Sequence, residues 1–210
     1  MKVSRGILEN GVVVGNTYDK YGSRNPIVRV LMNGFARTLD DLVDRVHPKT
    51  IHEVGCGEGY WVLNWARQGV DARGTDFSEK VIAIAKENAV AEGYGEELFC
   101  TKSIYELAQG VDSADLIVCC EVLEHLEDPE AGLAALQRVV GSYVILSVPR
   151  EPIWCAMNFA RGKYIGQFGN TPGHIQHWSK AGFTRLVDKY FDVLDVRSPL
   201  PWTMLLARAK

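Results

Sequence analysis

The sequence predicts a doubly wound α/β fold with a mostly parallel seven-stranded sheet and a terminal antiparallel strand. Short apolar runs alternate with helical patterns from residue 51 to residue 148, as in strands joined by crossover helices. The run Asp115–Cys120 is apolar after its first residue, which is typical of a parallel strand covered on both faces. Only residues 197–201 separate the last two apolar runs. Because that connection is too short for a crossover helix, the last strand should run antiparallel to its neighbour.

Local patterns predict each element in turn. The predicted helices are 26–46, 60–68, 78–92 and 128–141, and the predicted strands are 51–54, 72–75, 98–101, 115–120, 143–148, 191–196 and 202–207. Asn25-Pro26 opens the first helix, in which apolar residues recur at helical spacing. Ser78 suits a helix N-cap, and Gly93 suits the stop of the same helix. Asp128-Pro129 caps the helix expected to end at Gly141.

Length and composition favour one globular domain spanning residues 1–210, with an N-terminal arm and helix over 1–46. The hydrophobic content of 47% is ample for a full core, and the net charge of −3 gives no overall attraction for nucleic acid. The five cysteines lack C-x-x-C spacing, which predicts reduced thiols in a cytoplasmic protein. Since no run approaches the ~20 apolar residues of a membrane span, we expect at most a peripheral contact with a membrane.

The segment 149–178 interrupts the alternation of strands and helices. A strand-to-helix connection usually takes about 2–6 residues, whereas this segment is far longer and carries several aromatic side chains. Long insertions at the carboxyl edge of such a sheet commonly cover the ligand crevice. We therefore predict a lid, with a helical hairpin that only covers the sheet as the alternative.

Three alternating glycines (Gly55, Gly57 and Gly59) follow the strand 51–54, and Asp76 closes the next strand. Such glycines let the backbone approach a ligand at the head of a helix, and the carboxylate can accept hydrogen bonds from ribose hydroxyls. Tyr60 stands where the dinucleotide fingerprint G-x-G-x-x-G requires its third glycine. The pattern therefore indicates a bound nucleoside and disfavours an NAD-dependent oxidoreductase.

Glu53 lies two residues before the first of these glycines. Its negative charge would repel a phosphate but could hold an ammonium group. A cationic nucleoside that carries an amine fits this arrangement, and S-adenosyl-L-methionine is such a molecule.

Three segments resemble the signature motifs of class I S-adenosylmethionine-dependent methyltransferases, in particular the ubiquinone-biosynthesis O-methyltransferases. They are Glu53-Val-Gly-Cys-Gly-Glu-Gly59, Gly74-Thr-Asp-Phe-Ser78 and Cys120-Glu-Val-Leu-Glu-His-Leu126. The likeness extends over nearly the whole chain and implies the Rossmann-like fold of that family. It also includes the Asn25-Pro26…Arg29 arm, in which one extra residue shifts the arginine.

The resemblance implies a role for individual cofactor-binding residues. Gly55 and Gly57 would lie against the cofactor, Asp76 would hold the ribose diol, and Phe77 would flank the adenine. Further implied positions are Ser103 and Ile104 near the adenine amine, Cys120 and Glu121 beside the methionine part, and Arg29, or Arg24 if the arm shifts, on the cofactor carboxylate.

Glu121, Glu124 and His125 are spaced i, i+3 and i+4, and would share one face if they formed a first helical turn. Two carboxylates and an imidazole suit a divalent metal such as magnesium or manganese, with His174 or His177 as a fourth ligand. The pattern resembles the small-RNA 3′-terminal 2′-O-methyltransferases, where it binds a magnesium ion. Alternatively these residues only end a strand and cap a helix, and His125 or His174 is a general base.

Together these observations predict an enzyme that moves the methyl group of S-adenosylmethionine to a hydroxyl oxygen. Trp154, Met157 and Phe159, beside Arg161 and Lys163, suggest a small or lipophilic acceptor. Two alternatives remain. The enzyme could methylate the 2′-oxygen of an RNA 3′ end, although no RNA-binding domain accompanies it. The chain could also be a non-catalytic protein that binds S-adenosylmethionine or S-adenosylhomocysteine (SAH).

Overall fold

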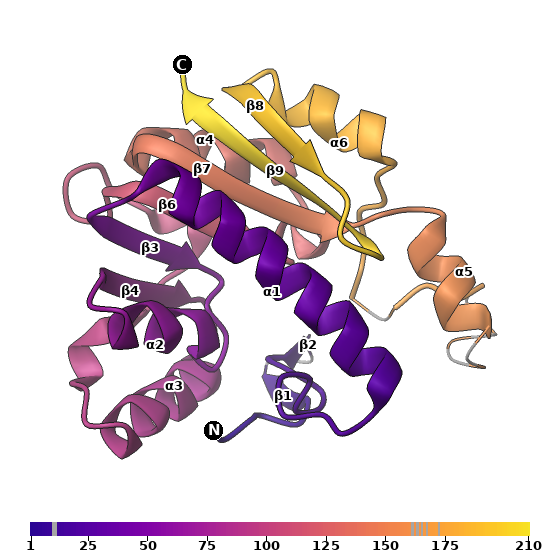
Figure 1. Cartoon of the computed structure of the whole chain (residues 1–210), viewed down its shortest axis with the longest axis horizontal. Helices are drawn as coiled ribbons and strands as arrows, with labels where there is room; N and C mark the ends of the chain where they lie inside the picture. Colours follow the sequence, from indigo (N-terminus) through magenta and orange to yellow (C-terminus); the bar gives the residue numbers. More distant parts are fainter. Residues whose placement is uncertain (10–11, 161, 163, 165, 167, 172) are drawn as a thin grey trace.

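A computed structural model describes the whole chain except residues 10–11, 161, 163, 165, 167 and 172. The central strands are β3 (Thr50–Val54), β4 (Asp71–Asp76), β5 (Phe99–Thr101), β6 (Ala114–Cys120), β7 (Val140–Pro149), β8 (Phe191–Arg197) and β9 (Trp202–Ala209). They form one seven-stranded sheet in the order β5-β4-β3-β6-β7-β9-β8 (Figure 1). The strands β3, β4, β5, β6 and β7 run parallel to one another. Strand β9 runs antiparallel to both of its neighbours, β7 and β8. The predicted fold class is confirmed.

Helices cover both faces of this sheet. They are α1 (Pro26–Val46), α2 (Tyr60–Arg67), α3 (Glu79–Ala91), α4 (Pro129–Val139), α5 (Ile153–Ala160) and α6 (Lys180–Val187), with short 3₁₀ turns η1 (Glu96–Leu98), η2 (Ile104–Glu106) and η3 (Leu123–His125). Helices α1, α2 and α3 pack into one buried cluster, and α4 and α6 pack into another. Strand β6 contributes Leu116 and Val118 to the first cluster and Ile117 and Cys119 to the second. Its apolar run is therefore explained by burial on both faces.

The helix starts follow the expected capping chemistry. The side chain of Asn25 accepts a hydrogen bond from the amide of Ile27, and Ser78 and Asp128 cap α3 and α4 in the same way. One predicted end was wrong, because α4 stops at Val139 rather than at Gly141. Val140 already pairs with β6, and a Cβ on Gly141 would lie 2.8 Å from the carbonyl oxygen of Ala114. Strand pairing therefore ends the helix.

The N-terminal arm contains a hairpin that the sequence did not predict. Strands β1 (Ile7–Glu9) and β2 (Val12–Val14) pair antiparallel in a sheet of their own. Three residues are too few to show the alternating pattern of a half-buried strand, so only the folded chain reveals this element.

The carboxyl ends of β3, β4 and β6 meet at one edge of the sheet, and the segment 149–178 begins at the same edge. This segment contains α5, which projects beyond the sheet (Figure 1), and returns to it where Trp178 bridges to Arg150. All five cysteines are free thiols. Across the described residues, no helix combines the length and apolarity needed to cross a membrane.

Candidate functional site

A cavity of about 1310 Å³ opens at the carboxyl edge of the sheet. Its walls come from the N-terminal arm, α1, the glycine loop, the ends of β4 and β6, α5, and the residues Thr171, Gly173 and His174. Most of the predicted site residues line it: Glu53, Gly55, Gly57, Asp76, Phe77, Ser103, Ile104, Cys120, Glu121, Glu124, His125 and His174. The topology thus brings together residues that are far apart in the sequence.

The glycine loop needs its glycines for both backbone conformation and space. Gly55 and Gly57 have φ angles of 79° and 54°, a region that other residues rarely adopt. A Cβ on Gly55 would lie 2.2 Å from the side chain of Val122. At Gly57 the nearest atom would be 3.9 Å away, so its backbone faces open space in the cavity.

Asp76 fastens this loop to the start of α3. Its carboxylate accepts hydrogen bonds of 3.0 Å from the amides of Gly57 and Ser78. Burial raises the pKa of the carboxyl group, and the two amides oppose that rise. Asp76 therefore ties the glycine loop to the turn that precedes α3, and it also lines the cavity.

Glu53 is a buried carboxylate with an unsatisfied oxygen. The residue is 5% exposed, and its Oε2 atom has no hydrogen-bond partner among the described residues. Burial raises its pKa well above the ordinary range. An unpaired buried acceptor is costly, so a donor supplied by a ligand would stabilise it.

The structure does not place Arg29 at the cavity. Arg29 lies exposed in the first turn of α1, and neither it nor Arg24 lines the cavity walls. The arm instead brings Lys20, Tyr18 and Tyr21 to the cavity. The predicted contact between Arg29 and the cofactor carboxylate therefore finds no support in this geometry.

Glu121 has a different environment from the one its spacing suggested. Its φ is 61°, and it precedes η3 instead of sharing a helix face with Glu124 and His125. Its carboxylate accepts hydrogen bonds from Ser147 Oγ at 2.9 Å and Trp202 Nε1 at 2.6 Å. Burial raises its pKa to about 7. Glu121 thus lies outside the turn that holds Glu124 and His125, and it is not part of the compact cluster formed by the other three predicted metal ligands.

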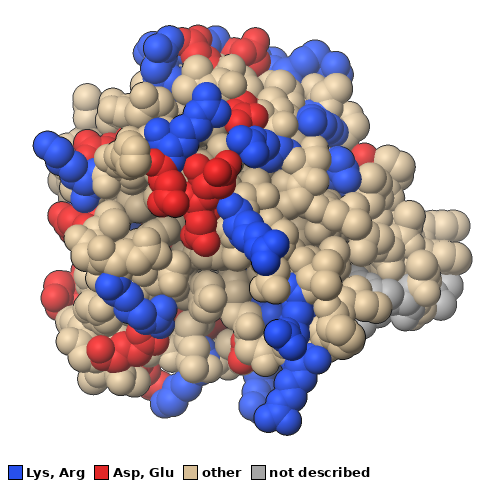
Figure 2. Space-filling model, in the orientation of Figure 1, with Lys and Arg blue, Asp and Glu red and all other residues tan. Residues whose placement is uncertain are grey.

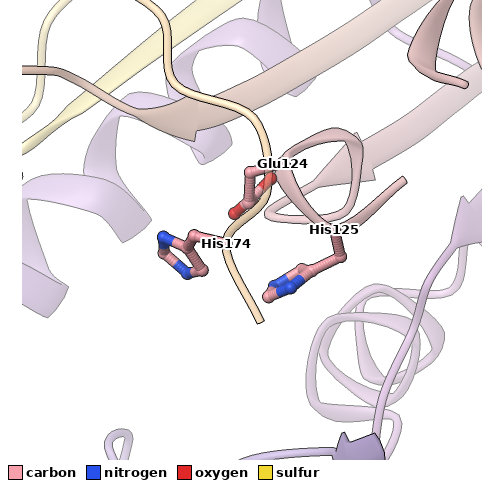
Figure 3. Close-up of side chains that lie close together, drawn as sticks. All are labelled: Glu124, His125 and His174. Atoms are coloured by element: carbon pink, nitrogen blue, oxygen red, sulfur yellow. The ribbon is translucent and has the colours of Figure 1, made fainter. Parts of the chain in front are cut away.

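Glu124, His125 and His174 form a compact cluster of possible ligands. One ligand atom from each residue lies within 4.8 Å of the others, and Figure 3 shows the three side chains converging. Both carboxylate oxygens of Glu124 are buried, and neither has a hydrogen-bond partner in the part of the chain that the structure describes. Burial and the neighbouring charge of Glu121 raise its pKa well above the usual range. A cation or a hydrogen-bond donor would relieve this unfavourable state.

Both histidines of the cluster favour their neutral forms. Burial lowers the pKa of each imidazole, and the positive charge that His125 would carry when protonated helps to lower the pKa of His174 to about 3. His125 Nδ1 donates to the carbonyl oxygen of Gly173 at 2.8 Å, which leaves Nε2 with a free lone pair. The exposed His177 instead contacts Asn170 at 2.9 Å, so His174 is the histidine that joins the cluster.

The lid segment divides into lining and outer residues. Trp154 and Met157 line the cavity, whereas Phe159 is 52% exposed and does not. Trp154 lies 5.6 Å from His174 and 6.0 Å from Trp202, measured between ring centroids. The basic residues predicted beside them, Arg161 and Lys163, fall outside the described residues. The described part of the segment therefore contributes Trp154 and Met157 to the cavity wall, and its role as a lid stays a prediction.

Curated relatives carry the name ubiquinone biosynthesis O-methyltransferase. The relative from Acinetobacter baumannii (strain ACICU) is 31% identical over 118 residues, which are 54% of this chain and 50% of the relative. The relative from Aeromonas salmonicida (strain A449) is 28% identical over 133 residues, or 60% and 56%. The chain thus spans about half the length of the curated relatives it matches.

Solved structures share the fold. The magnesium protoporphyrin IX methyltransferase (ChlM) of Synechocystis PCC 6803 with bound SAH superposes with a TM-score of 0.68 at 22% identity, covering 90% of both chains. The methyltransferase domain of bacterial CtHen1-CN gives a TM-score of 0.62 at 20% identity, covering 85% of this chain and 99% of that one. The family model described as a methyltransferase domain matches residues 30–193. Because that match covers most of the chain, the protein belongs to this methyltransferase domain family.

Proposed function

We propose that the protein is an S-adenosylmethionine-dependent methyltransferase that methylates a hydroxyl oxygen of a small or lipophilic acceptor. One observation carries this proposal: a single cavity joins the glycine loop and Asp76 to the cluster of Glu124, His125 and His174. The first part suits a nucleoside cofactor. The cluster of Glu124, His125 and His174 offers carboxylate oxygens and imidazole nitrogens that can accept the proton of a hydroxyl group.

Methyl transfer from a sulfonium is an in-line displacement, so catalysis depends largely on positioning and on the exclusion of water. The aromatic walls formed by Trp154, Trp202 and Phe35 would exclude water from the reacting atoms. A neutral imidazole can accept the hydroxyl proton as the methyl group transfers. Nε2 of His125 and the ring of His174 are the candidates for this role.

The donor set of the cluster fits a divalent cation such as magnesium or manganese. Glu124 supplies two carboxylate oxygens that no described residue binds, and His125 and His174 supply imidazole nitrogens. When bound, such an ion would lower the pKa of a coordinated hydroxyl group. Glu121, already held by Ser147 and Trp202, is not needed for this set.

The cavity lining supports an apolar acceptor. Leu31, Met32 and Phe35 of α1 face it together with Trp154 and Met157 of α5. The name of the curated relatives, ubiquinone biosynthesis O-methyltransferase, is consistent with a lipophilic acceptor. We expect the acceptor to reach a cytoplasmic protein directly or from a membrane surface.

The metal-ligand cluster favours one second candidate, 2′-O-methylation of an RNA 3′ end. The net charge of −3 argues against it. Basic and acidic side chains are also mixed over the upper part of the face in Figure 2. An oligonucleotide with a free 3′ end therefore serves as the alternative substrate in the test below.

Two measurements test the proposal. Calorimetry should detect binding of SAH but not of NAD. Labelled S-adenosylmethionine should then transfer its methyl group to a molecule in a lipid extract, identified by mass spectrometry as an O-methyl product. Binding of NAD alone would refute the cofactor assignment. Labelling of the oligonucleotide in place of the extract would establish the second candidate.

A further inference from the structure

The amino-acid end of the proposed cofactor carries an ammonium and a carboxylate group. Removing either charge from water is costly unless the protein supplies an opposite charge. The cavity must therefore offer both an anion and a cation at this end. Arg29, the cation implied by the sequence, does not line the cavity.

Glu53 provides the anion. Its buried carboxyl group lies beside the glycine loop, and no described residue forms a hydrogen bond with its Oε2 atom. An ammonium group placed there would satisfy this oxygen and favour the charged form of Glu53.

Lys20 is the cation best placed to face it. Among the described lining residues, the lysines and arginines are Lys20 and Lys102. Lys102 is already paired, because its Nζ lies 2.9 Å from both carboxylate oxygens of Asp112. Lys20 forms no ion pair within the described part of the chain. Burial raises the pKa of Glu53 and of Glu121, and the charge of Lys20 is the next largest influence and opposes that rise.

The N-terminal arm holds Lys20 in position from both sides. The next residue, Tyr21, stacks on Tyr60 of α2 with ring centroids 3.6 Å apart and planes 4° apart. On the other side, the glycine-loop residue Glu58 accepts hydrogen bonds from the amides of Ser4 and Asn16 at 3.0 and 2.8 Å, and from both of their side chains. Burial raises the pKa of Glu58, but these hydrogen bonds outweigh it and lower the pKa overall. Glu58 therefore stays charged and keeps the arm on the cofactor loop.

We propose that Lys20 binds the carboxylate of the cofactor's amino-acid end opposite Glu53, and that it does so only while the arm is fastened to Glu58. The cofactor site is then completed by the arm, which lies largely outside the region matched by the family model. This inference rests on the proposed function.

Calorimetry with two ligands tests the carboxylate contact. S-adenosylmethionine and its decarboxylated form share the nucleoside, the sulfonium and the amine, and differ in the carboxylate alone. Lys20→Met should weaken binding of S-adenosylmethionine by about 10- to 100-fold, as for a lost hydrogen bond to a charged group. The same variant should bind the decarboxylated form at least as well as the wild type does. Lys20→Arg should recover most of the loss.

Arg29→Met is the matched control and should bind both ligands as the wild type does. An undiminished affinity of Lys20→Met for S-adenosylmethionine would overturn the inference while leaving the proposed function intact. An equal loss for both ligands would also overturn it, because Lys20 would then act on the structure of the site. If the wild type bound neither ligand, the proposed function itself would fail.

A further variant tests the arm. Ser4→Ala removes one of the hydrogen bonds to Glu58 without touching the cavity lining. This variant should bind S-adenosylmethionine about 3-fold more weakly or worse, and its affinity for the decarboxylated form should stay the same. A loss shared by both ligands would show that the arm does not act through Lys20.

Discussion

Asp76 shows how one side chain can serve both the fold and the site. Its carboxylate holds the amides of Gly57 and Ser78 and faces the cavity. Asp76→Ala should therefore weaken SAH binding by about 1–3 kcal/mol, because ribose hydroxyls would lose their acceptor. Glu79→Ala, an exposed acid in the first turn of α3, is the control and should bind normally. Unchanged affinity of the Asp76 variant in calorimetry would place the nucleoside elsewhere.

His52 should make the fold sensitive to acid. It is fully buried, with Nδ1 donating to the carbonyl oxygen of Asp112 at 2.8 Å and Nε2 accepting from Thr75 at 2.9 Å. Burial chiefly lowers its pKa from 6.5 to about 4. The unfolded chain therefore binds more protons than the native protein between those values, so stability falls as the pH falls from about 6.5 towards about 4.

The expected size of this effect is about 2 kcal/mol of unfolding free energy between about pH 7 and about pH 5. Urea unfolding of the wild type and of His52→Gln measures it, because the variant lacks the titrating group. The wild type should lose more stability than the variant over this interval. Parallel losses in both proteins would show that other groups control the acid response.

At the scale of single residues, the sequence located those whose role depends on neighbours in the chain. Gly55, Gly57 and Asp76 line the cavity as expected because strand ends place them there. The hydrogen bonds of Glu121 could not be predicted, since its carboxylate accepts from Trp202 at the far end of the chain. Lys20 was missed for a similar reason: only the folded arm brings it into the cavity.

At the scale of elements, the lid helix α5 offers a direct test of acceptor binding. Trp154 lines the cavity, contacts the rings of His174 and Trp202, and donates from Nε1 to Thr171 at 2.9 Å. Trp154→Ser should lower kcat/KM for the acceptor by about 10-fold or more, because it removes a large apolar wall. The KM for S-adenosylmethionine should stay the same.

Phe159→Ser is the matched control on the same helix, because Phe159 is exposed outside the cavity. Its kinetics should equal those of the wild type. If both variants lost activity equally, or if Trp154→Ser failed to unfold cooperatively, Trp154 would belong to the core of the lid and not to an acceptor pocket.

The elements themselves were predictable wherever local chemistry determines them. Caps such as Ser78 and the apolar run of β6 gave the helix starts and the buried strands. The end of α4 and the β1–β2 hairpin were not predictable in this way, because strand pairing creates them. Val140 pairs with Ala114 of β6 and is therefore not part of α4. No neighbouring residue in the sequence indicates that the helix ends before it.

At the scale of the whole molecule, the fold joins the lid to the end of β6. The amides of Ile175 and Gln176 donate to the carbonyl oxygen of Glu124 at 2.9 and 3.0 Å. His125 also donates to the carbonyl oxygen of Gly173. These bonds place His174 beside Glu124 and His125, so the three-residue cluster depends on them.

This arrangement predicts that a divalent ion links activity to the docking of the lid. An excess of chelator should abolish methyl transfer while SAH still binds, and magnesium, manganese or cobalt should restore it. The same ions should raise the unfolding temperature, because they bind only the folded site. His125→Ala and His174→Ala should each lower activity and the metal content measured by elemental analysis.

His177→Ala is the control for those variants, because His177 is exposed and bonded to Asn170. It should keep both metal and activity. Full activity in chelator, together with a metal-free protein by elemental analysis, would rule out the ion. The neutral imidazoles of His125 and His174 would then act as proton acceptors beside a protonated Glu124, whose raised pKa already favours that form. In that case His125→Ala should still lower kcat, and the loss should be insensitive to added metal.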